Sequence, residues 1–264
     1  MRQSLVIVAS PRPGSFVHAL AEAAASTLSE AGHEVRFHDL YVERFNPVLD
    51  PAEAATTRTA DESAFTVGAD PLTTRHRREL YTADTLVVAH PNWWGKPPAI
   101  MAGWIDRVIV AGVAYRLDSA EGEPTCLLRL QRLIVLNTGD TAPERESKVF
   151  GDPLSAIWER CIGAYLGDAT VERLLASPLS GSSPEQRETW LARARRIAAP
   201  GGPRGRQAGR AARRATPAAR KRPDASADSD RRGPGSAWDK ARTARRLEND
   251  SARAPPGAST WRTS

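Results

Sequence analysis

Three short runs of apolar, mostly β-branched residues lie at 5–9, 85–90 and 133–137. Runs of this length and composition are typical of strands that are buried on both faces, as in a parallel sheet. The pattern also predicts a strand at 34–39 and an edge strand at 170–174. Because helical segments separate these strands, the sequence predicts an α/β domain with a doubly wound parallel sheet.

The helical segments are marked by apolar residues at helical spacing. In the first, from Phe16 to Ala31, Ser15 suits the N-cap and Gly32 the end of the helix. Further helices are predicted at 77–83, 98–109, 153–166 and 184–198. Residues 41–75 have no clear period and are rich in Pro, Thr and Asp, so they are predicted to form a long loop with room for one helical turn.

The composition of the chain changes near residue 200. Residues 200–264 contain 16 Lys and Arg against 6 Asp and Glu, a net charge of +10, whereas the whole 264-residue chain carries +6. Trp238, Leu247 and Trp261 are the large apolar side chains of this segment. Such a composition cannot bury enough apolar surface to offset chain entropy. The sequence therefore predicts a folded domain at 1–199, with a net charge of −4, and a disordered basic tail at 200–264.

A basic, disordered tail can bind nucleic acid or acidic lipid without sequence specificity. It can also arise from an extended or shifted reading frame in a GC-rich gene. The interpretation that we favour is a solvated extension without a dedicated partner, so no specific nucleic-acid partner is expected.

The chain contains two cysteines, Cys126 and Cys161, which have neither the spacing of a metal site nor that of a redox pair. This usage suits a reducing compartment. Met1 leads directly into the first strand without a signal peptide, and no apolar run approaches the roughly 18 residues that a membrane span requires. We therefore expect a soluble cytoplasmic protein without a bound metal.

The loop after the first strand has the character of a phosphate-binding loop. In an open parallel sheet, ligands bind at the carboxyl ends of the strands, near the point where the strand order reverses. The loop reads Ser-Pro-Arg-Pro-Gly-Ser-Phe at 10–16 and leads into a helix N-terminus, whose free N–H groups favour a phosphate. Ser10 and Ser15 add hydroxyl donors. Neither the Walker pattern nor the dinucleotide fingerprint is present, and a tight turn with a capping serine is the alternative.

Two further loops follow buried strands and complete the candidate site. The first, Pro91-Asn92-Trp93-Trp94-Gly95, contains adjacent tryptophans that suit a wall beside a flat aromatic ligand, because a loop rarely buries two indoles. Alternatively, one of them closes the sheet edge or a dimer interface. The second, Asn137-Thr138-Gly139, offers backbone N–H groups and a hydroxyl, although by itself it is only a turn signal.

Together these segments resemble the flavodoxin-like NAD(P)H:quinone oxidoreductases, the DT-diaphorase group and its bacterial relatives, which include ancillary subunits of potassium efflux systems. The likeness extends from about Leu5 to Ala198, and its most specific part runs from Pro91 to Val108. The other matching segments are Ala9-Ser10-Pro11 with Ser15-Phe16, Ala114-Tyr115, Asn137-Thr138-Gly139 and Phe150-Gly151-Asp152-Pro153-Leu154.

The resemblance implies a bound flavin, FAD or FMN, and hydride transfer from NAD(P)H to a quinone-like acceptor. It also implies a homodimer with the isoalloxazine near the subunit interface, and it allows peripheral association with a transporter. By position, Ser15 and Phe16 would lie at the phosphate and ribityl end, Pro91, Asn92, Trp93 and Trp94 along the ring, and Thr138 and Gly139 at its polar edge. Ser10, Gly95 and Asn137 complete the expected cofactor-binding set.

Two residues outside these loops are also implied by the resemblance. Asp106 falls where the family has an acidic residue associated with the cofactor, and Tyr115 where an aromatic residue lines the acceptor pocket. The alternatives are an ordinary pairing of Asp106 with a neighbouring Arg and a core position for Tyr115 at a helix end.

The sequence departs from DT-diaphorase at several positions, which bear on the acceptor and on the choice between FAD and FMN. Residues 141–147 contain no Tyr, Phe150 stands near the expected His, and Ser10 and Val17 replace a His and an Asn. Hydride transfer depends less on them, because the flavin carries that chemistry. No acid-base residue is assigned, since the histidines, His18, His33, His38, His76 and His90, show no catalytic arrangement in the sequence.

Two other functions remain open at this point. The domain could be a non-catalytic regulatory subunit that senses a flavin or a nucleotide, or it could carry a nucleic-acid-binding tail. The first alternative shares the predicted flavin site but not turnover, whereas the second depends on residues 200–264.

Overall fold

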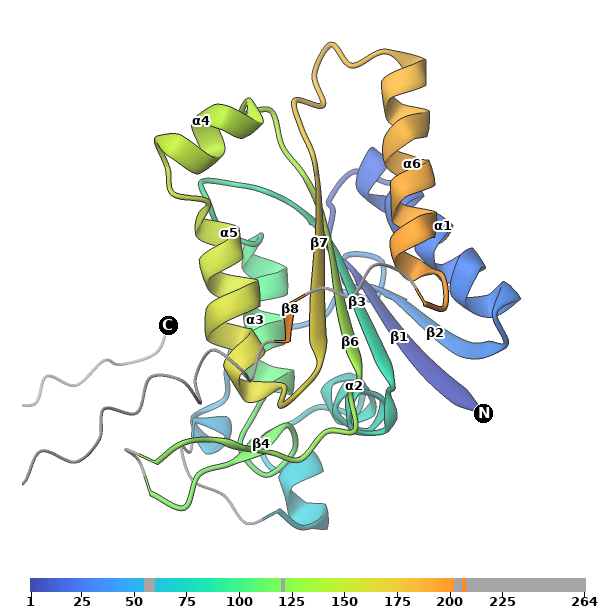
Figure 1. The fold of residues 1–264 in the computed structure, drawn as a ribbon. Coiled ribbons are helices and arrows are strands. Elements are labelled where there is room, and N and C mark those ends of the chain that lie inside the picture. The colour runs from blue at the N-terminus through green and yellow to red at the C-terminus, as the bar shows by residue number, and fades with distance from the viewer. Residues whose placement is uncertain (55–59, 120–121, 202–205, 208–264) are drawn as a thin grey trace, which may run out of the picture. The chain divides into compact units, whose positions relative to one another are not determined.

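The computed structural model describes residues 1–54, 60–119, 122–201 and 206–207. Its centre is a six-stranded sheet with the order β2-β1-β3-β6-β7-β8 (Figure 1). Five strands are parallel, namely β1 (Arg2–Val8), β2 (His33–Asp39), β3 (Thr85–Pro91), β6 (Arg132–Thr138) and β7 (Thr170–Ala176). The two-residue β8 (Arg206–Gln207) is antiparallel to β7. A separate ribbon pairs β4 (Tyr115–Arg116) with β5 (Thr125–Cys126).

Helices cover both faces of the sheet, as Figure 1 shows. One face carries α1 (Phe16–Glu30) and α6 (Pro184–Ala198), and the other carries α2 (Pro71–Thr82), α3 (Ala99–Val108) and α5 (Pro153–Ser155). The last continues as a π-helix, η3 (Ala156–Cys161), and a 3-10 turn, η4 (Ile162–Tyr165). Successive residues of β1 point to opposite faces, so Val6 packs under α1 and α6 and Ile7 under the other layer.

The parallel α/β fold that the sequence predicts is therefore confirmed. The strands predicted from apolar runs are present, each one to three residues longer than expected at one end or both. The first helix begins at Phe16 and ends before Gly32, whose φ of +83° suits the residue that stops a helix. Ser15 is at the N-cap position, but its side chain does not cap the helix.

Several boundaries differ from the prediction because local signals were missed. α2 begins at Pro71, inside the predicted 41–75 loop, since Asp70 caps it and Pro suits a first turn. That loop also contains two 3-10 turns, η1 (Pro51–Glu53) and η2 (Glu62–Phe65). A short helix, α4 (Pro143–Lys148), and the β4–β5 ribbon were not predicted. β7, predicted as an edge strand, pairs with β8 at Thr170 and Val171.

The structure describes only a few residues of the C-terminal segment 200–264. The two-residue β8 lies beyond Ala199, where the sequence predicts the folded domain to end, and that boundary stays a prediction. The chain divides into two units, Met1–Thr216 and Pro217–Ser264, and the sheet belongs to the first. Apart from residues 200–201 and 206–207, the predicted disordered tail lies outside the described residues. Within the described ranges, no helix is long and apolar enough to cross a membrane.

A buried ion cluster fastens the long segment after β2 to the helices. Glu53 of η1 is 3% exposed and accepts from Arg77 Nη2 at 2.5 Å and from Arg107 Nε at 2.9 Å. Arg107 also bonds with Asp70 at 3.0 Å and with the carbonyl of Asn46 at 2.8 Å. A buried guanidinium needs such partners, because an uncompensated buried charge is costly. The cluster thus joins η1, α2 and α3.

We expect Glu53→Gln to lower the free energy of unfolding by about 3 kcal/mol, because it leaves two buried guanidinium groups short of negative charge. Glu62→Gln is the matched control, since it removes an exposed carboxylate that pairs with Arg78 and should cost less than about 1 kcal/mol. Urea denaturation followed by circular dichroism measures both. Equal, small losses would mean that the buried cluster does not hold this segment.

Candidate functional site

The register of the parallel sheet brings the three predicted loops to one edge. Pro91 at the end of β3 pairs with Thr138 of β6, and Thr138 pairs with Ala176 of β7. Beyond the strands, the N–H of Asn92 donates to the carbonyl of Thr138 at 2.7 Å, and the N–H of Gly139 donates to that of Ala176 at 3.1 Å. These backbone hydrogen bonds fix the first residues of the loops at the carboxyl edge of the sheet.

Two adjoining pockets lie at this carboxyl edge of the sheet, with volumes of about 560 and 370 Å³. Four residues line both of them: Asn92, Gly139, Asp140 and Thr141. The larger pocket is completed by Trp94, Gly95, Glu146, Phe150, Pro153, Leu175 and Ser177. The smaller is completed by Ser10, Pro11, Arg12, Ser15, Phe16, Val17, Pro91, Trp93, Thr138 and Leu179. Because they share a wall, the pockets form one elongated candidate site.

The smaller pocket is suited to an anion. The hydroxyls of Ser10 and Ser15 lie 2.9 Å apart, and the pocket is lined by the first residues of α1. The N–H groups of a helix's first turn have no partners within the helix, and the helix dipole favours negative charge there. Arg12, exposed in the same loop, adds positive charge. This end of the site has the donors that a phosphate requires.

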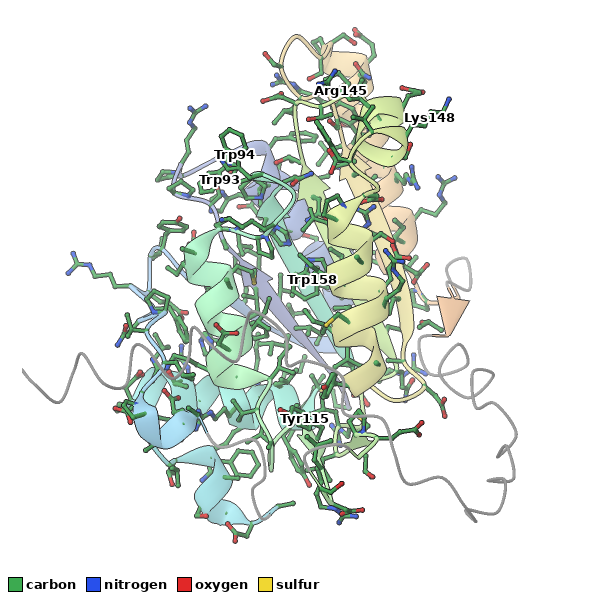
Figure 2. The ribbon with its side chains drawn as sticks, turned by 90° about the vertical axis from the view of Figure 1, so that its left-hand side faces the viewer. Trp93, Trp94, Tyr115, Arg145, Lys148 and Trp158 are labelled. Atoms are coloured by element: carbon green, nitrogen blue, oxygen red, sulfur yellow. The ribbon has the colours of Figure 1, made fainter. Side chains whose placement is uncertain are left out.

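The tryptophan loop is a tight turn that holds its indoles outside the core. Trp93 and Lys96 exchange two backbone hydrogen bonds, both of 3.1 Å. Trp94 has a φ of +58°, a conformation that costs a non-glycine residue about 1 kcal/mol or more. Its side chain is 98% exposed and that of Trp93 41%. Figure 2 shows both at the same end of the domain. The loop thus presents aromatic surface at the mouth of the site.

Asn92 and Glu146 connect this loop to α4. The Asn92 amide donates to Glu146 at 2.8 Å, and its oxygen accepts from the N–H of Gly95 at 3.0 Å. Glu146 is 4% exposed and lines the larger pocket. The sequence analysis did not single out Glu146, because α4 was not predicted. Its signal was the Pro-Glu-Arg-Glu start at 143–146, which is typical of a helix first turn.

A neutral, buried histidine, His90, lies at the end of β3, just before the loop that carries Asn92 and the two tryptophans. The Trp158 indole, which can only donate, donates to His90 Nε2 at 2.9 Å, so the ring proton lies on Nδ1 and is donated to the carbonyl of Pro91. Burial lowers the pKa of His90 to about 4. The amide of Asn137 donates to the backbone carbonyl of His90 at 3.2 Å. Asn137 therefore supports the end of β3, and neither Asn137 nor His90 lines either of the two pockets.

Asp106 and Tyr115 are not brought into the pockets of this chain. Asp106 is exposed on α3, whereas its neighbour Arg107 makes the buried ion pairs described above. Tyr115 packs against Tyr165, with the ring centroids 4.7 Å apart, and burial raises its pKa. In Figure 2 it lies at the opposite end of the domain from Trp93 and Trp94. Their assignment to the site thus remains a prediction.

The structure also reveals a histidine arrangement that the sequence did not indicate. Ser15 Oγ lies 2.9 Å from His18 Nδ1, and His18 Nε2 lies 2.8 Å from Asp39 Oδ2. Ser10, Ser15, His18 and Asp39 therefore form one hydrogen-bonded chain that begins in the smaller pocket. The sequence analysis assigned no role to His18, and the structure places it next to Ser15 at the edge of the smaller pocket. Asp39 lies 21 residues further along the sequence, at the end of β2, and no short motif marks the pair.

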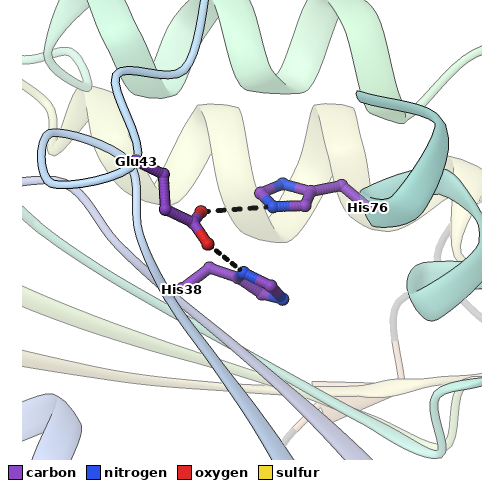
Figure 3. Close-up of side chains that lie close together, drawn as sticks. All are labelled: His38, Glu43 and His76. Atoms are coloured by element: carbon purple, nitrogen blue, oxygen red, sulfur yellow. Dashed lines mark hydrogen bonds and ion pairs between the residues drawn. The ribbon is translucent and has the colours of Figure 1, made fainter. Parts of the chain in front are cut away.

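A second cluster joins His38, Glu43 and His76 away from the pockets (Figure 3). His38 lies between two carboxylates, Glu43 at 2.8 Å and Glu79 at 2.6 Å. Although burial opposes its charge, these bonds raise the pKa of His38. Trp104 donates to His76 Nδ1 at 2.9 Å, so the proton of His76 is on Nε2, and burial lowers its pKa to about 3. Nε2 of the neutral His76 lies 3.4 Å from Glu43, so the ion pairs of this cluster are those of His38 with Glu43 and Glu79.

An open parallel sheet with a site at its carboxyl edge, beside the reversal of strand order, defines the flavodoxin-like class of α/β proteins. Residues 2–199 match the model of the family described as having a flavodoxin-like fold, and the chain belongs to that family. Its relatives place it with the NAD(P)H:quinone oxidoreductases and their bacterial counterparts. Rat NAD(P)H dehydrogenase (quinone) 1 is 27% identical over 209 residues, which cover 73% of this chain and 76% of the relative.

Other comparisons add a bacterial relative and two solved structures that share the fold. An uncharacterized NAD(P)H oxidoreductase of Escherichia coli strain K12 is 34% identical over 110 residues, 42% of this chain and 54% of that protein. The solved NAD(P)H:quinone oxidoreductase from Methanothermobacter marburgensis has the same fold, with a TM-score of 0.60 and 24% identity over 75% of this chain and 97% of its own. An azoreductase from Bacillus anthracis, solved in complex with FMN, gives a TM-score of 0.54 at 13% identity, covering 75% and 98%.

The buried histidine under the site predicts an acid-sensitive fold. Because the pKa of His90 is lowered from 6.5 to about 4, the unfolded chain binds the extra proton first as the pH falls. The stabilisation is complete above pH 6.5 and declines toward pH 4. Between pH 7 and 5 we expect this residue to account for about 2 kcal/mol of lost stability. His90→Gln should reduce the loss measured by urea denaturation, and an unchanged loss would contradict the assignment.

Proposed function

We propose that the chain binds a flavin nucleotide, FAD or FMN, along the two adjoining pockets and uses it to transfer two electrons, as a hydride, from reduced nicotinamide to a quinone-like acceptor. The observation that carries the proposal is that a pocket lined by the Ser10 and Ser15 hydroxyls and the start of α1 joins a pocket lined by Trp94 and Phe150. The two pockets share Asn92, Gly139, Asp140 and Thr141. A flavin nucleotide has the same two chemical ends, a phosphate and a flat ring.

The residues present fit such a ligand. Ser10, Ser15 and the α1 N-terminus offer hydroxyl and N–H donors to a phosphate. Gly139 leaves room at the junction: an added Cβ there would lie 3.3 Å from Ser177 Oγ and 3.7 Å from Asn92 Cβ. A side chain at this position would enter the space between the pockets, and glycine keeps that space open.

The exposed indoles support the aromatic end of the proposal. Burying an indole is favourable, because it removes a large apolar area from contact with water. Trp94 is nevertheless 98% exposed, and its backbone is held in the left-handed region. Such an arrangement is explained if the indole contacts a ligand or a second subunit. We include the homodimer in the proposal for the same reason, because a neighbouring subunit would cover this surface.

The names of the relatives point to the same chemistry. The rat relative is a quinone-reducing NAD(P)H dehydrogenase, and the Escherichia coli relative is an NAD(P)H oxidoreductase. The Bacillus anthracis azoreductase shares the fold and was solved with FMN. On this basis the chain is an oxidoreductase of the NAD(P)H dehydrogenase (quinone) type.

Each part of the site then has a role. The flavin supplies the two-electron chemistry when it is bound. Ser10 and Ser15 bind its phosphate, Trp93 and Trp94 contact the ring and exclude water, and the Asn92–Glu146 bond fixes the loop that carries the indoles. His90 holds the start of that loop through its hydrogen bond to the carbonyl of Pro91. Substrates enter beside Phe150, which is 48% exposed at the wall of the larger pocket.

The proposal is tested by purifying the protein and recording its absorption spectrum. We expect a flavin spectrum, either as purified or after reconstitution, and chromatography of the released cofactor identifies FAD or FMN. Protein that stays colourless after incubation with both would rule the flavin out. With flavin bound, NADPH-driven reduction of menadione should follow, and bound flavin without turnover would instead favour the non-catalytic sensor.

Replacing Trp94 tests the aromatic end separately. Trp94→Ala should weaken flavin binding about tenfold, which corresponds to about 1.4 kcal/mol. The melting temperature of the protein should not fall, because Trp94 is exposed in a loop and does not pack in the core. Tyr81→Ala is the control, because Tyr81 is an exposed aromatic residue of α2 that lines neither pocket. Fluorescence titration measures both variants. If they bind flavin equally well, Trp94 does not contact the ring.

A further inference from the structure

The hydrogen-bonded chain from Ser10 to Asp39 ends in the pocket that the proposed function assigns to a phosphate. Ser10 and Ser15 line the smaller pocket, whereas His18 and Asp39 do not. His18 is 7% exposed and lies in the first turn of α1, with Nδ1 2.9 Å from Ser15 Oγ. The pair His18–Asp39 therefore reaches a ligand only through the Ser15 hydroxyl.

Asp39 fixes the proton on the far side of the imidazole. Its carboxylate can only accept, so His18 Nε2 donates to Oδ2 at 2.8 Å. The other oxygen, Oδ1, accepts from the N–H groups of Tyr41 and Val42 at 2.9 and 3.2 Å. These bonds hold the carboxylate in place and leave Nδ1 as the ring atom whose protonation can change.

The state of Nδ1 decides what Ser15 can offer to a ligand. When Nδ1 is unprotonated, the Ser15 hydroxyl donates to it and turns away from the pocket. When Nδ1 is protonated, it donates to Ser15 Oγ, and the hydroxyl proton is free for another acceptor. In the structure that hydroxyl is directed to Ser10 Oγ, 2.9 Å away, along the wall of the pocket. An anion in the pocket favours the second state, because it requires both the donor and the positive charge.

The same three residue types form the catalytic triad of serine hydrolases, but the connections differ. In that triad the serine faces Nε2 and the aspartate faces Nδ1, whereas here Ser15 faces Nδ1 and Asp39 faces Nε2. Ser15 also precedes the first turn of a helix in a loop suited to anions. These features favour phosphate recognition over nucleophilic catalysis.

We propose that His18, held by Asp39, is a positioning residue that turns the Ser15 hydroxyl toward the ligand's phosphate and supplies a positive charge behind it. This inference rests on the proposed function, and it concerns the phosphate that follows the ribityl chain, which FMN and FAD share. Among the described residues, Asp39 is the charged group that bonds to His18. Arg12 in the loop and Glu22 one turn further along α1 are both exposed.

The test compares FMN with riboflavin, which has the same ring and no phosphate. We expect His18→Gln to weaken FMN binding ten- to a hundredfold, as for a lost hydrogen bond to a charged group, and to change riboflavin binding less than twofold. Asp39→Asn keeps the oxygen that caps Tyr41 and Val42 but no longer favours an imidazolium, so it should have the same selective effect. FAD binding should weaken with that of FMN. Fluorescence titration gives all the dissociation constants.

His33→Gln is the matched control. His33 also bonds to a serine, with Nδ1 2.7 Å from Ser4 Oγ, but at the amino end of the sheet. It should leave both FMN and riboflavin binding unchanged. Parallel loss of the two ligands in His18→Gln would show a merely structural role and overturn the proposal, as would unchanged binding of both.

The failure of the proposed function can be told apart from the failure of this inference. If the unaltered chain binds neither riboflavin nor FMN, the flavin assignment fails. The phosphate role is then measured with inorganic phosphate, which should raise the melting temperature of the unaltered chain and of His33→Gln but not of His18→Gln. An equal rise in all three, or no rise in any, would overturn the phosphate role of His18. If His18→Gln does not fold, Asp39→Asn decides the same question.

Discussion

The parallel sheet is covered by helices on both faces, and this burial determines where polar chemistry can occur. In the centre of the sheet, β1, β3 and β6 are largely apolar on both sides, and their backbone groups pair with neighbouring strands. Loops and the side chains that they carry are therefore free only at the strand ends. At the carboxyl ends of β1, β3, β6 and β7, the matched register places four such loops next to one another. The pockets lie at this edge because, where the strand order reverses, the connections from adjacent strands lead to opposite faces of the sheet and leave a crevice between them.

The polar side chains that do enter the core are paired by groups of fixed donor character. An indole N–H can only donate, so Trp158 and Trp104 each fix the lone pair of a histidine, His90 and His76. Both rings are neutral, because burial lowers their pKa values to about 4 and about 3. A neutral hydrogen-bonded pair avoids the desolvation cost of an ion. Glu53 differs, because it is buried as a charged group between two arginines. The protein thus satisfies buried polar groups in two ways, by neutral hydrogen-bonded pairs and by ion pairs.

The sequence alone was sufficient to predict the parallel sheet and the positions of the loops at 10–16 and 91–95, because both depend on local patterns of residues. Apolar runs predict buried strands, and adjacent tryptophans between Pro91 and Gly95 indicate surface aromatic residues, as Trp94 shows. Contacts between distant segments were out of reach. Glu146 meets Asn92 across 54 residues, and Asp39 meets His18 across 21. Asn137 looked like a loop residue, yet it is buried, because β6 extends through Thr138 and turns its side chain under the site. A single sequence has no signal for these pairings.

The proposed function assigns the smaller pocket to the phosphate of a flavin and the larger pocket to its ring, and these two ends of the site are organised by different kinds of contact. At the phosphate end, Ser10, Ser15 and His18 are neighbours in sequence on one loop and one helix, so folding of the first β–α–β unit is enough to place them. At the ring end, the indole loop is fixed through Asn92 to Glu146 on α4, a helix of six residues whose other residues are exposed. A short exposed helix opens more easily than a packed one, because little buried area opposes the opening. The smaller pocket is thus the more rigid half of the site, and under the proposed function it would anchor the nucleotide while the larger pocket adjusts to the substrate.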